Sequence, residues 1–275
     1  MKNSILTKSI SYKDFKKEIL NDYRNIVISR EASLLGRKEV LSGKAKFGIF
    51  GDGKELPQIA MAKVFDKGDF RSGYYRDQTF MFAINKLTVK QFFSGLYANT
   101  SFEEEPMSGG RQMGSHFSSI FVDNKGDFVD LTNQYNISSD ISPTSGQMPR
   151  LLGLAMASKH FRSGKFNCNK LSNNGNEIAW GTIGNASTSE GLFFETVNAI
   201  GVHQVPAVIS IWDDDYGISV DNSYQTTKSS ISEALKGFQR TKTEKGFEIL
   251  TVNGWDYPSL ISTYEHANNL SLIHI

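Results

Sequence analysis

The sequence has little cysteine, almost no net charge and no long hydrophobic run. Cys168 is the only cysteine among 275 residues, so neither a disulfide framework nor a cysteine metal site is available, and a reducing, cytoplasmic setting is expected. Thirty Lys and Arg residues against 29 Asp and Glu residues leave a formal charge of +1. This balance argues against nucleic acid or a membrane surface as a partner. Any anion that the protein binds must therefore be captured locally.

No segment approaches the roughly 20 consecutive apolar residues of a membrane span, and the N-terminus lacks the apolar core of a signal peptide. We therefore expect no membrane partner. With 39% hydrophobic residues, the chain is long enough to form one large or two small domains with a sizeable core.

The clearest structural signal is a strand, a helix and a second strand. Residues 177–183 and 206–212 are typical of buried strands, and residues 192–200 have helical spacing. Strands and helix at this separation form a parallel crossover unit, so the fold class is α/β, a mainly parallel sheet flanked by helices. A third strand is expected at 247–252. Further helices are expected at residues 12–42, 56–64 and 148–161. Two more helices should begin directly after the cap residues Thr88 and Asp256. Residues 99–145 should be irregular.

Three aspartates, Asp213–Asp215, directly follow the second predicted strand. In parallel sheets ligands bind at the carboxyl ends of the strands, so these aspartates and the turn after Ile183 should face a common ligand. Ser187 and Glu190 fit a capping box, which predicts a helix start that can bind an anion. The alternative for the aspartates is a solvated turn, because Asp and Gly are ordinary turn formers.

Oxygen donors gather at the same predicted edge. Asn185 offers a side-chain oxygen, Asp214 offers a carboxylate, and the backbone carbonyl of Tyr216 can supply a third oxygen. Hard oxygen ligands beside phosphate oxygens and water describe an octahedral Mg²⁺ site. A diphosphate with Mg²⁺ would therefore explain why charges of one sign end a buried strand.

Five segments resemble, in order, the alpha subunit of the thiamine diphosphate-dependent decarboxylating component of 2-oxo acid dehydrogenase complexes. The most informative one begins at Gly184 with GNASTSEG and closes with DDDYGIS, and it is similar to the family's thiamine diphosphate motif. The resemblance covers roughly residues 45–269. The other segments are YYRD at 74–77, GGRQMGSHF at 109–117, ISSDISPTSGQMPRLLGLAMASK at 137–159 and VNGWD at 252–256.

The resemblance implies a thiamine diphosphate-binding fold with thiamine diphosphate and Mg²⁺ as cofactors. Asn185 stands where the family has its acidic metal ligand, Asp214 stands where the family has an asparagine ligand, and Tyr216 matches the residue that gives its backbone carbonyl to the metal. One carboxylate and one amide have changed places, so the formal charge of the site is unchanged and we expect the exchange to be compensated. Gly184 and Ala186 flank the first ligand and are expected to bind the cofactor.

Further roles are implied by the other segments. Tyr75 and Arg76 match the family pair that holds the diphosphate, and an arginine fork suits phosphate oxygens. His116 could face the active site, but a loop histidine is as often a structural donor. Asp213 and Asp215 are expected to be solvated or helix-facing charges. No catalytic residue is assigned, because the family's glutamate that activates the aminopyrimidine ring belongs to the beta subunit or to a fused beta half.

The function implied is that of an oxidoreductase, the alpha part of a 2-oxo acid dehydrogenase. It would decarboxylate a branched-chain 2-oxo acid and pass the acyl group to a lipoyl domain, in a heterotetramer with beta subunits. Pyruvate or acetoin is the alternative substrate, and a non-catalytic cofactor-binding relative is a second alternative because the acidic metal ligand is replaced. An unrelated nucleotide-binding module is disfavoured, since no G-x-x-x-x-G-K-[ST] loop occurs.

We expect three segments along the chain. Residues 1–44 form an N-terminal helical extension, and residues 45–269 form the cofactor-binding domain, incomplete at its C-terminus. The final LSLIHI, residues 270–275, does not continue the family pattern and is expected to be a non-native tail on a truncated fragment.

Overall fold

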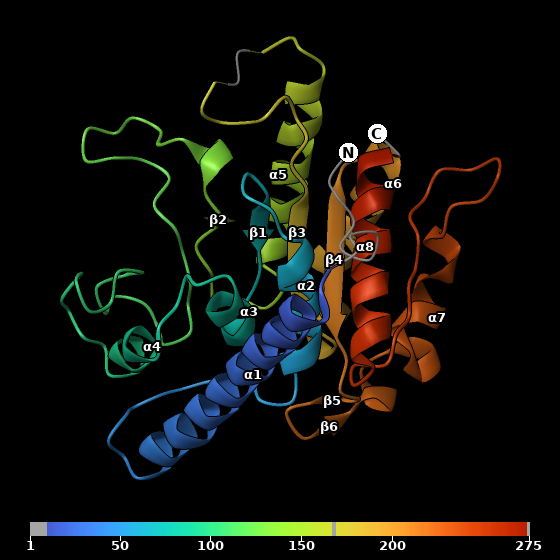
Figure 1. Cartoon of the computed structure of the whole chain (residues 1–275). Helices are drawn as coiled ribbons and strands as arrows, with labels where there is room; N and C mark the ends of the chain where they lie inside the picture. Colours follow the sequence, from blue (N-terminus) through green and yellow to red (C-terminus); the bar gives the residue numbers. More distant parts are fainter. Residues whose placement is uncertain (1–9, 167–168, 274–275) are drawn as a thin grey trace. The chain divides into compact units, whose positions relative to one another are not determined.

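The computed structural model describes residues 10–166 and 169–273, and these form two compact units (Figure 1). The first unit contains the described residues up to Phe65 together with Tyr75–Ser118 and Val252–His266. The second contains Asp66–Tyr74, Ser119–Thr251 and the described residues from Ala267 onward. The boundaries expected at residues 44 and 269 stay predictions, and the last two residues of the expected tail lie outside the described residues.

A four-stranded parallel sheet lies in the second unit, with the order β2-β1-β3-β4. Strands β3 (Ala179–Gly184) and β4 (Ala207–Trp212) are the two that the sequence predicts, and they run parallel. The expected α/β class is therefore confirmed. The two further strands, β1 (Phe70–Ser72) and β2 (Asn136–Ile137), are short.

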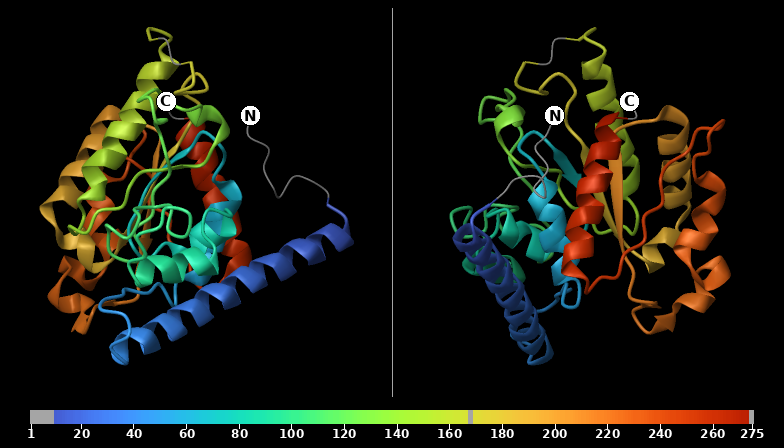
Figure 2. Two further views of the ribbon diagram at one scale, coloured as in Figure 1. Left: turned by 90° about the vertical axis from the view of Figure 1, so that its left-hand side faces the viewer. Right: turned by 45° about the vertical axis from the view of Figure 1, so that its right-hand side comes forward.

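Helices α5 (Gln147–Arg162) and α6 (Gly191–His203) pack against each other and share a core with the sheet, as Figure 2 also shows. Leu151 of α5 approaches β3 so closely that a Cβ atom added to Gly181 would lie 2.4 Å from its Cδ2 atom. Only glycine leaves room for this contact. The core of the unit is formed by Met148, Leu151, Ala155, Ala179, Ile183, Phe193, Val197, Ile200, Val205, Ile231 and Leu235.

The first unit is helical. Helix α1 (Tyr12–Leu41) packs against α2 (Glu55–Val64), α3 (Gln78–Ala83) and α4 (Val89–Leu96). The predicted Thr88 cap is confirmed as a capping box, in which the Thr88 hydroxyl accepts from Gln91 N and Gln91 Oε1 accepts from Thr88 N. Asp256 caps α8 (Tyr257–Ile273) by accepting from Ser259 N at 3.2 Å. No helix in the described part of the chain is long and apolar enough to cross a membrane.

The helices and strands between β4 and α8 are short. A hairpin pairs β5 (Tyr216–Gly217) with β6 (Val220–Asp221), and α7 covers Ile231–Leu235. Turns of 3₁₀-helix are formed by Leu131–Asn133, Ala186–Ser189, Asn222–Tyr224, Thr227–Ser229 and Lys236–Phe238.

The strand expected at 247–252 is wrong. Phe247 forms an isolated bridge with Gln239, and the following residues have no strand partner in the described structure. The apolar side chains that suggested a strand instead serve packing, because Phe247 and Ile249 lie against the core. Residues 99–145, expected to be irregular, contain β2, and β1 was not predicted; both strands are too short to give a periodic signal.

The close approach of α5 to the sheet predicts that Gly181→Ala destabilises the fold. The new methyl group would collide with Leu151, and overpacking of this kind costs about 1–3 kcal/mol. Gly153→Ala is the control, since a Cβ atom there meets nothing within 4 Å and alanine in a helix is more stable than glycine by about 0.5–1 kcal/mol. Free energies of unfolding from denaturant titration should therefore move in opposite directions, and a neutral Gly181→Ala would contradict the packing argument.

Candidate cofactor site

Strands β3 and β4 end side by side. Gly184 is in register with Trp212, and the backbone N–H of Asn185 donates to the Trp212 carbonyl at 3.4 Å. The prediction that the turn after Ile183 and the three aspartates occupy one edge of the sheet is confirmed. This is the edge at which parallel sheets bind ligands.

The chain then returns across this edge through the β5–β6 hairpin. A Cβ atom added to Gly217 would lie 2.6 Å from the Ala186 Cβ atom, so the hairpin lies against the 3₁₀-helix that follows Asn185. In the sequence, Asp214 lies between Trp212, the last residue of β4, and Tyr216, the first residue of β5. The second unit therefore gathers the predicted positions Gly184, Asn185, Ala186, Asp214 and Tyr216 at one end of two neighbouring strands.

Asn185 is the buried member of this group, with 3% of its surface exposed. Its side-chain nitrogen is buried and has no hydrogen-bond partner among the described residues. Leaving a buried donor unsatisfied costs about 1–3 kcal/mol. A bound ligand would remove this cost in one of two ways. It could accept a hydrogen bond from the side-chain nitrogen, or a metal ion could bind the side-chain oxygen after a 180° flip of the Asn185 amide group.

The aspartates are exposed, and Asp215 N donates to Asp213 Oδ1 at 3.1 Å within the turn. The available donors are the Asn185 amide, the Asp214 carboxylate and the Tyr216 carbonyl, all oxygens of the kind that Mg²⁺ takes together with phosphate oxygens and water. Within residues 10–166 and 169–273, no group of three or more His, Cys, Asp or Glu side chains could hold a metal. The residues present thus fit a magnesium ion that is shared with a diphosphate.

The predicted capping box is wrong. Helix α6 begins at Gly191, and its N-cap residue Glu190 makes no side-chain cap hydrogen bond. The preceding residues form a 3₁₀-helix instead, in which Glu190 N donates to the Ser187 carbonyl at 3.3 Å and the Ser145 hydroxyl donates to the same oxygen. The anion site expected from a helix start directly after residue 186 is therefore not formed by α6.

A cationic cluster that sequence reasoning missed lies near the ends of β1 and β2. Arg71 and Asp140 form a fully buried ion pair at 3.1 Å. Arg150 donates through Nε to the Ser72 hydroxyl at 3.0 Å and through Nη1 to the Ser139 carbonyl at 2.6 Å, while its buried Nη2 has no partner in the described chain. Burial lowers the pKa of Arg150, and Asp140 partly offsets this effect. Two guanidinium groups against one carboxylate leave a surplus positive charge, which favours an anionic ligand.

Tyr75, Arg76 and His116 belong to the first unit. The Arg76 Cζ atom lies 5.3 Å from the centroid of the Tyr75 ring, and the Tyr75 and His116 rings are stacked with centroids 6.2 Å apart. The Arg76 carbonyl accepts from Gln58 Nε2 at 2.9 Å, which holds the backbone of the pair. The three predicted residues of the first unit are therefore neighbours.

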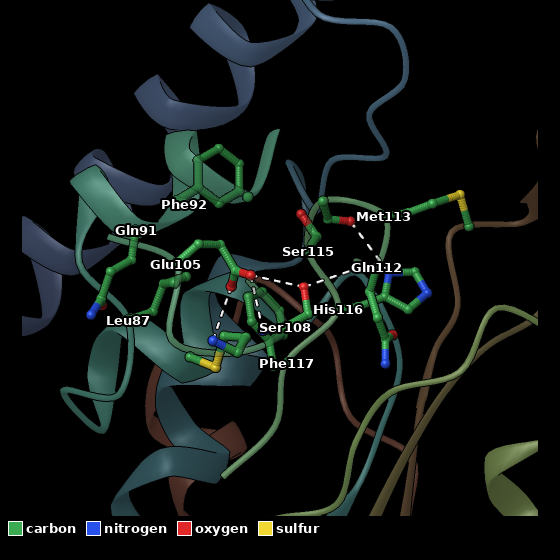
Figure 3. Close-up of a pocket in the computed structure, with 13 residues that line it drawn as sticks. Leu87, Gln91, Phe92, Glu105, Ser108, Gln112, Met113, Ser115, His116 and Phe117 are labelled. Atoms are coloured by element: carbon green, nitrogen blue, oxygen red, sulfur yellow. Dashed lines mark hydrogen bonds between the residues drawn. The ribbon is translucent and has the colours of Figure 1, made fainter. Parts of the chain in front are cut away.

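The loop that carries His116 is folded around Glu105 (Figure 3). The buried carboxylate accepts from the backbone N–H groups of Met107, Ser108 and Gly110 at 2.9–3.0 Å and from the Ser108 hydroxyl at 2.8 Å. Burial alone would raise the pKa of Glu105, but these hydrogen bonds together outweigh it and the pKa is lowered. The pocket beside the carboxylate has a volume of about 10 Å³, room for at most one water molecule, so the loop encloses no substrate cavity here.

We predict that Glu105→Gln destabilises the chain by about 1.5–3 kcal/mol at neutral pH, because hydrogen bonds to a charged acceptor are lost. Because the pKa of Glu105 is lower in the folded chain than in the unfolded chain, ionised Glu105 contributes its full stabilisation above the unfolded pKa of about 4.3. This stabilisation is lost as the pH falls through the folded-state pKa. The difference between the wild type and the variant should therefore shrink below about pH 4. Glu104→Gln, which breaks only the outer Lys90 ion pair, should cost under about 1 kcal/mol. Denaturant titrations at several pH values test this, and a pH-independent difference would contradict it.

Two curated proteins and one family model are similar to this chain in sequence. The chain is 28% identical over 245 residues to the 2-oxoisovalerate dehydrogenase subunit alpha of Bacillus subtilis (strain 168), an alignment that covers 87% of this chain and 62% of that protein. It is 25% identical over 221 residues to the pyruvate dehydrogenase E1 component subunit alpha of Acholeplasma laidlawii, which covers 80% and 51%. The chain thus spans about half to three-fifths of the length of these curated relatives. The family model "Dehydrogenase E1 component" matches residues 23–268, and because this is most of the chain, the protein belongs to the dehydrogenase E1 component family.

Proposed function

We propose that this chain is the alpha part of a thiamine diphosphate-dependent 2-oxo acid dehydrogenase that decarboxylates a branched-chain 2-oxo acid and transfers the acyl group to a lipoyl domain. The family membership and the names of both relatives support the reaction class. The observation that carries the cofactor assignment is the buried side-chain nitrogen of Asn185, which has no hydrogen-bond partner among the described residues, at the end of β3 and next to the strand that leads to Asp214.

In this proposal the chain binds and orients the cofactor. Asn185, Asp214 and the Tyr216 carbonyl hold Mg²⁺, while Tyr75 and Arg76 hold the diphosphate. The backbone of Gly184 and Ala186 lines the same turn. When bound, thiamine diphosphate would supply the nucleophile and the electron sink for the loss of CO₂ from a 2-oxo acid.

The proposal requires partners. The glutamate that activates the aminopyrimidine ring would come from a beta subunit or a fused beta half, so the chain should be active only in an assembly, a heterotetramer where beta is separate. The acyl group would leave on the lipoyl domain of an acyltransferase component. The cytoplasmic location expected from the single cysteine stays a prediction.

The branched-chain substrate is favoured because GRQM at 110–113 and TSEG at 188–191 resemble that branch. The 2-oxoisovalerate dehydrogenase relative is also the more similar of the two compared. Pyruvate or acetoin is the alternative substrate. A non-catalytic cofactor-binding relative remains the second alternative, since Asn185 replaces an acidic ligand.

We predict that Asp214→Ala weakens the Mg²⁺ dependence of cofactor binding. Loss of a residue that only hydrogen-bonds to a metal ligand typically lowers metal affinity roughly 10–100-fold. Loss of a carboxylate ligand itself should therefore raise the half-saturating Mg²⁺ concentration by at least this factor. The measurement is calorimetric binding of thiamine diphosphate to the full chain with its beta half, over a series of Mg²⁺ concentrations.

Two variants provide the controls for this titration. Asp215→Asn removes a neighbouring charge and keeps the left-handed backbone at φ 64°, which asparagine tolerates, so the Mg²⁺ dependence should not change. The double variant Asn185→Asp, Asp214→Asn preserves the formal charge and should bind the metal far better than Asp214→Ala. If Asp214→Ala retains wild-type Mg²⁺ dependence, the metal assignment is wrong.

The proposed reaction is tested by dye reduction with 2-oxoisovalerate and with pyruvate, using the full chain with its beta half. We expect turnover only when thiamine diphosphate and Mg²⁺ are present. The kcat/KM for 2-oxoisovalerate should be higher by at least roughly tenfold, since even one methylene in a fitted pocket is worth about that much. Preference for pyruvate would establish the alternative substrate, and tight cofactor binding without turnover would identify the non-catalytic relative.

A further inference from the structure

Helix α1 turns its apolar residues away from its own unit. The residues that it buries are Asp22, Ser29, Ala32, Ser33, Gly36 and Glu39, which are small or polar. Six of its large apolar residues are exposed on the other side: Tyr12 by 79%, Leu20 by 56%, Tyr23 by 64%, Val27 by 38%, Leu34 by 46% and Leu41 by 82%. Phe15 and Leu35 are also exposed, but they point elsewhere around the helix. A helix of a self-contained globular unit has the opposite arrangement.

These six exposed residues, called here the apolar stripe, lie on one line along the helix. At 3.6 residues per turn they occupy an arc of about 80°, and the buried residues occupy the opposite side. Leu20, Val27, Leu34 and Leu41 follow one another at intervals of seven residues. A seven-residue repeat is the seam that packs lengthwise against another helix. The full length of α1 is visible in Figure 2.

The charges of α1 are segregated in the same way. Three of its five acidic residues pair within its own unit: Lys63 pairs with Glu18 and with Asp22 at 2.8 Å, and Glu39 accepts from Tyr97 Oη at 2.6 Å and pairs with Lys44 at 3.3 Å. Six charged residues lie exposed beside the apolar stripe. Arg30 and Arg37 pair with Glu55 and Asp52 of the same unit, which leaves three cations, Lys13, Lys16 and Lys38, against one acid, Glu31.

This charge distribution selects the partner. Two copies of α1 placed stripe to stripe would bring cations against cations, which costs free energy at an interface. A helix with apolar residues and acidic flanks would satisfy both features. We propose that the apolar stripe docks lengthwise on such a helix of the beta chain, an inference that rests on the proposed function.

The experiment compares Leu34→Glu with Leu35→Glu in the full chain. The two leucines are adjacent and similarly exposed, at 46% and 48%, but they point about 100° apart around the helix and only Leu34 belongs to the apolar stripe. Binding of the purified beta chain is measured by calorimetry. Leu34→Glu should weaken binding by at least roughly tenfold, as expected for a central anchor, and Leu35→Glu should leave it within about twofold. Circular dichroism and thermal melts check that both variants remain folded.

A charge variant supplies an independent readout. Lys16→Glu with Lys38→Glu should weaken binding and reduce its dependence on salt concentration, because screened attraction to acidic flanks is lost. Equal effects of Leu34→Glu and Leu35→Glu, or wild-type binding by Leu34→Glu, would overturn the docking site and leave the proposed function intact. Absence of any beta binding by the wild type would overturn both.

Two other occupants of the apolar stripe are tested with the same variants. A wild-type chain that dimerises without beta and becomes monomeric as Leu34→Glu would show that a second copy covers the stripe. Binding to phosphatidylserine–phosphatidylcholine vesicles that is lost in Leu34→Glu would show a lipid surface. Either result would overturn the proposal, whereas a monomeric chain that ignores such vesicles and binds beta through Leu34 would support it.

Discussion

The register between β3 and β4 is the constraint on which the candidate cofactor site depends. Because Gly184 pairs with Trp212, both strands leave the sheet at the same level, and the residues that follow them lie at the same edge. A slip of one residue would turn every side chain of a strand to the opposite face. Helix α5 holds β3 from one side, since Gln147 Nε2 donates to the Thr182 carbonyl at 2.9 Å and Leu151 fills the space left by Gly181.

Helices and strands were predicted correctly where one regular spacing of apolar residues extends over the whole helix or strand. The crossover unit of β3, α6 and β4 and the capped helices α4 and α8 were predicted because apolar spacing and cap residues agree there. The predictions failed where tertiary context decides. Residues 247–252 have the apolar side chains of a strand, but Phe247 has only an isolated bridge to Gln239. Conversely, β1 pairs with two neighbours although it is three residues long and includes the buried Arg71.

The candidate site was predictable to the same degree. That Asn185 and Asp214 should meet followed from the rule for parallel strands, and the structure places both at one edge. The burial of Asn185 and its unpartnered nitrogen did not follow, because the sequence does not show how the β5–β6 hairpin lies on Ala186. The cluster of Arg71, Asp140 and Arg150 was not predicted either, because Arg71 is far in sequence from the other two, and the segment 137–159 that contains them shows no pairing with Arg71. Long-range contacts of this kind require the fold.

Helix α1 shows why periodicity alone is not enough to locate a core. The apolar spacing of Leu20, Tyr23 and Val27 correctly predicted a helix, yet these side chains are exposed. The helix is held instead by small residues that allow close approach: a Cβ atom on Gly36 would lie 2.4 Å from the Phe50 ring. Attachment through small and polar residues leaves the leucine seam free for another surface. The same apolar spacing therefore predicts a helix whether its apolar side is buried or exposed. The small residues on the other side of α1 show which side packs against the first unit.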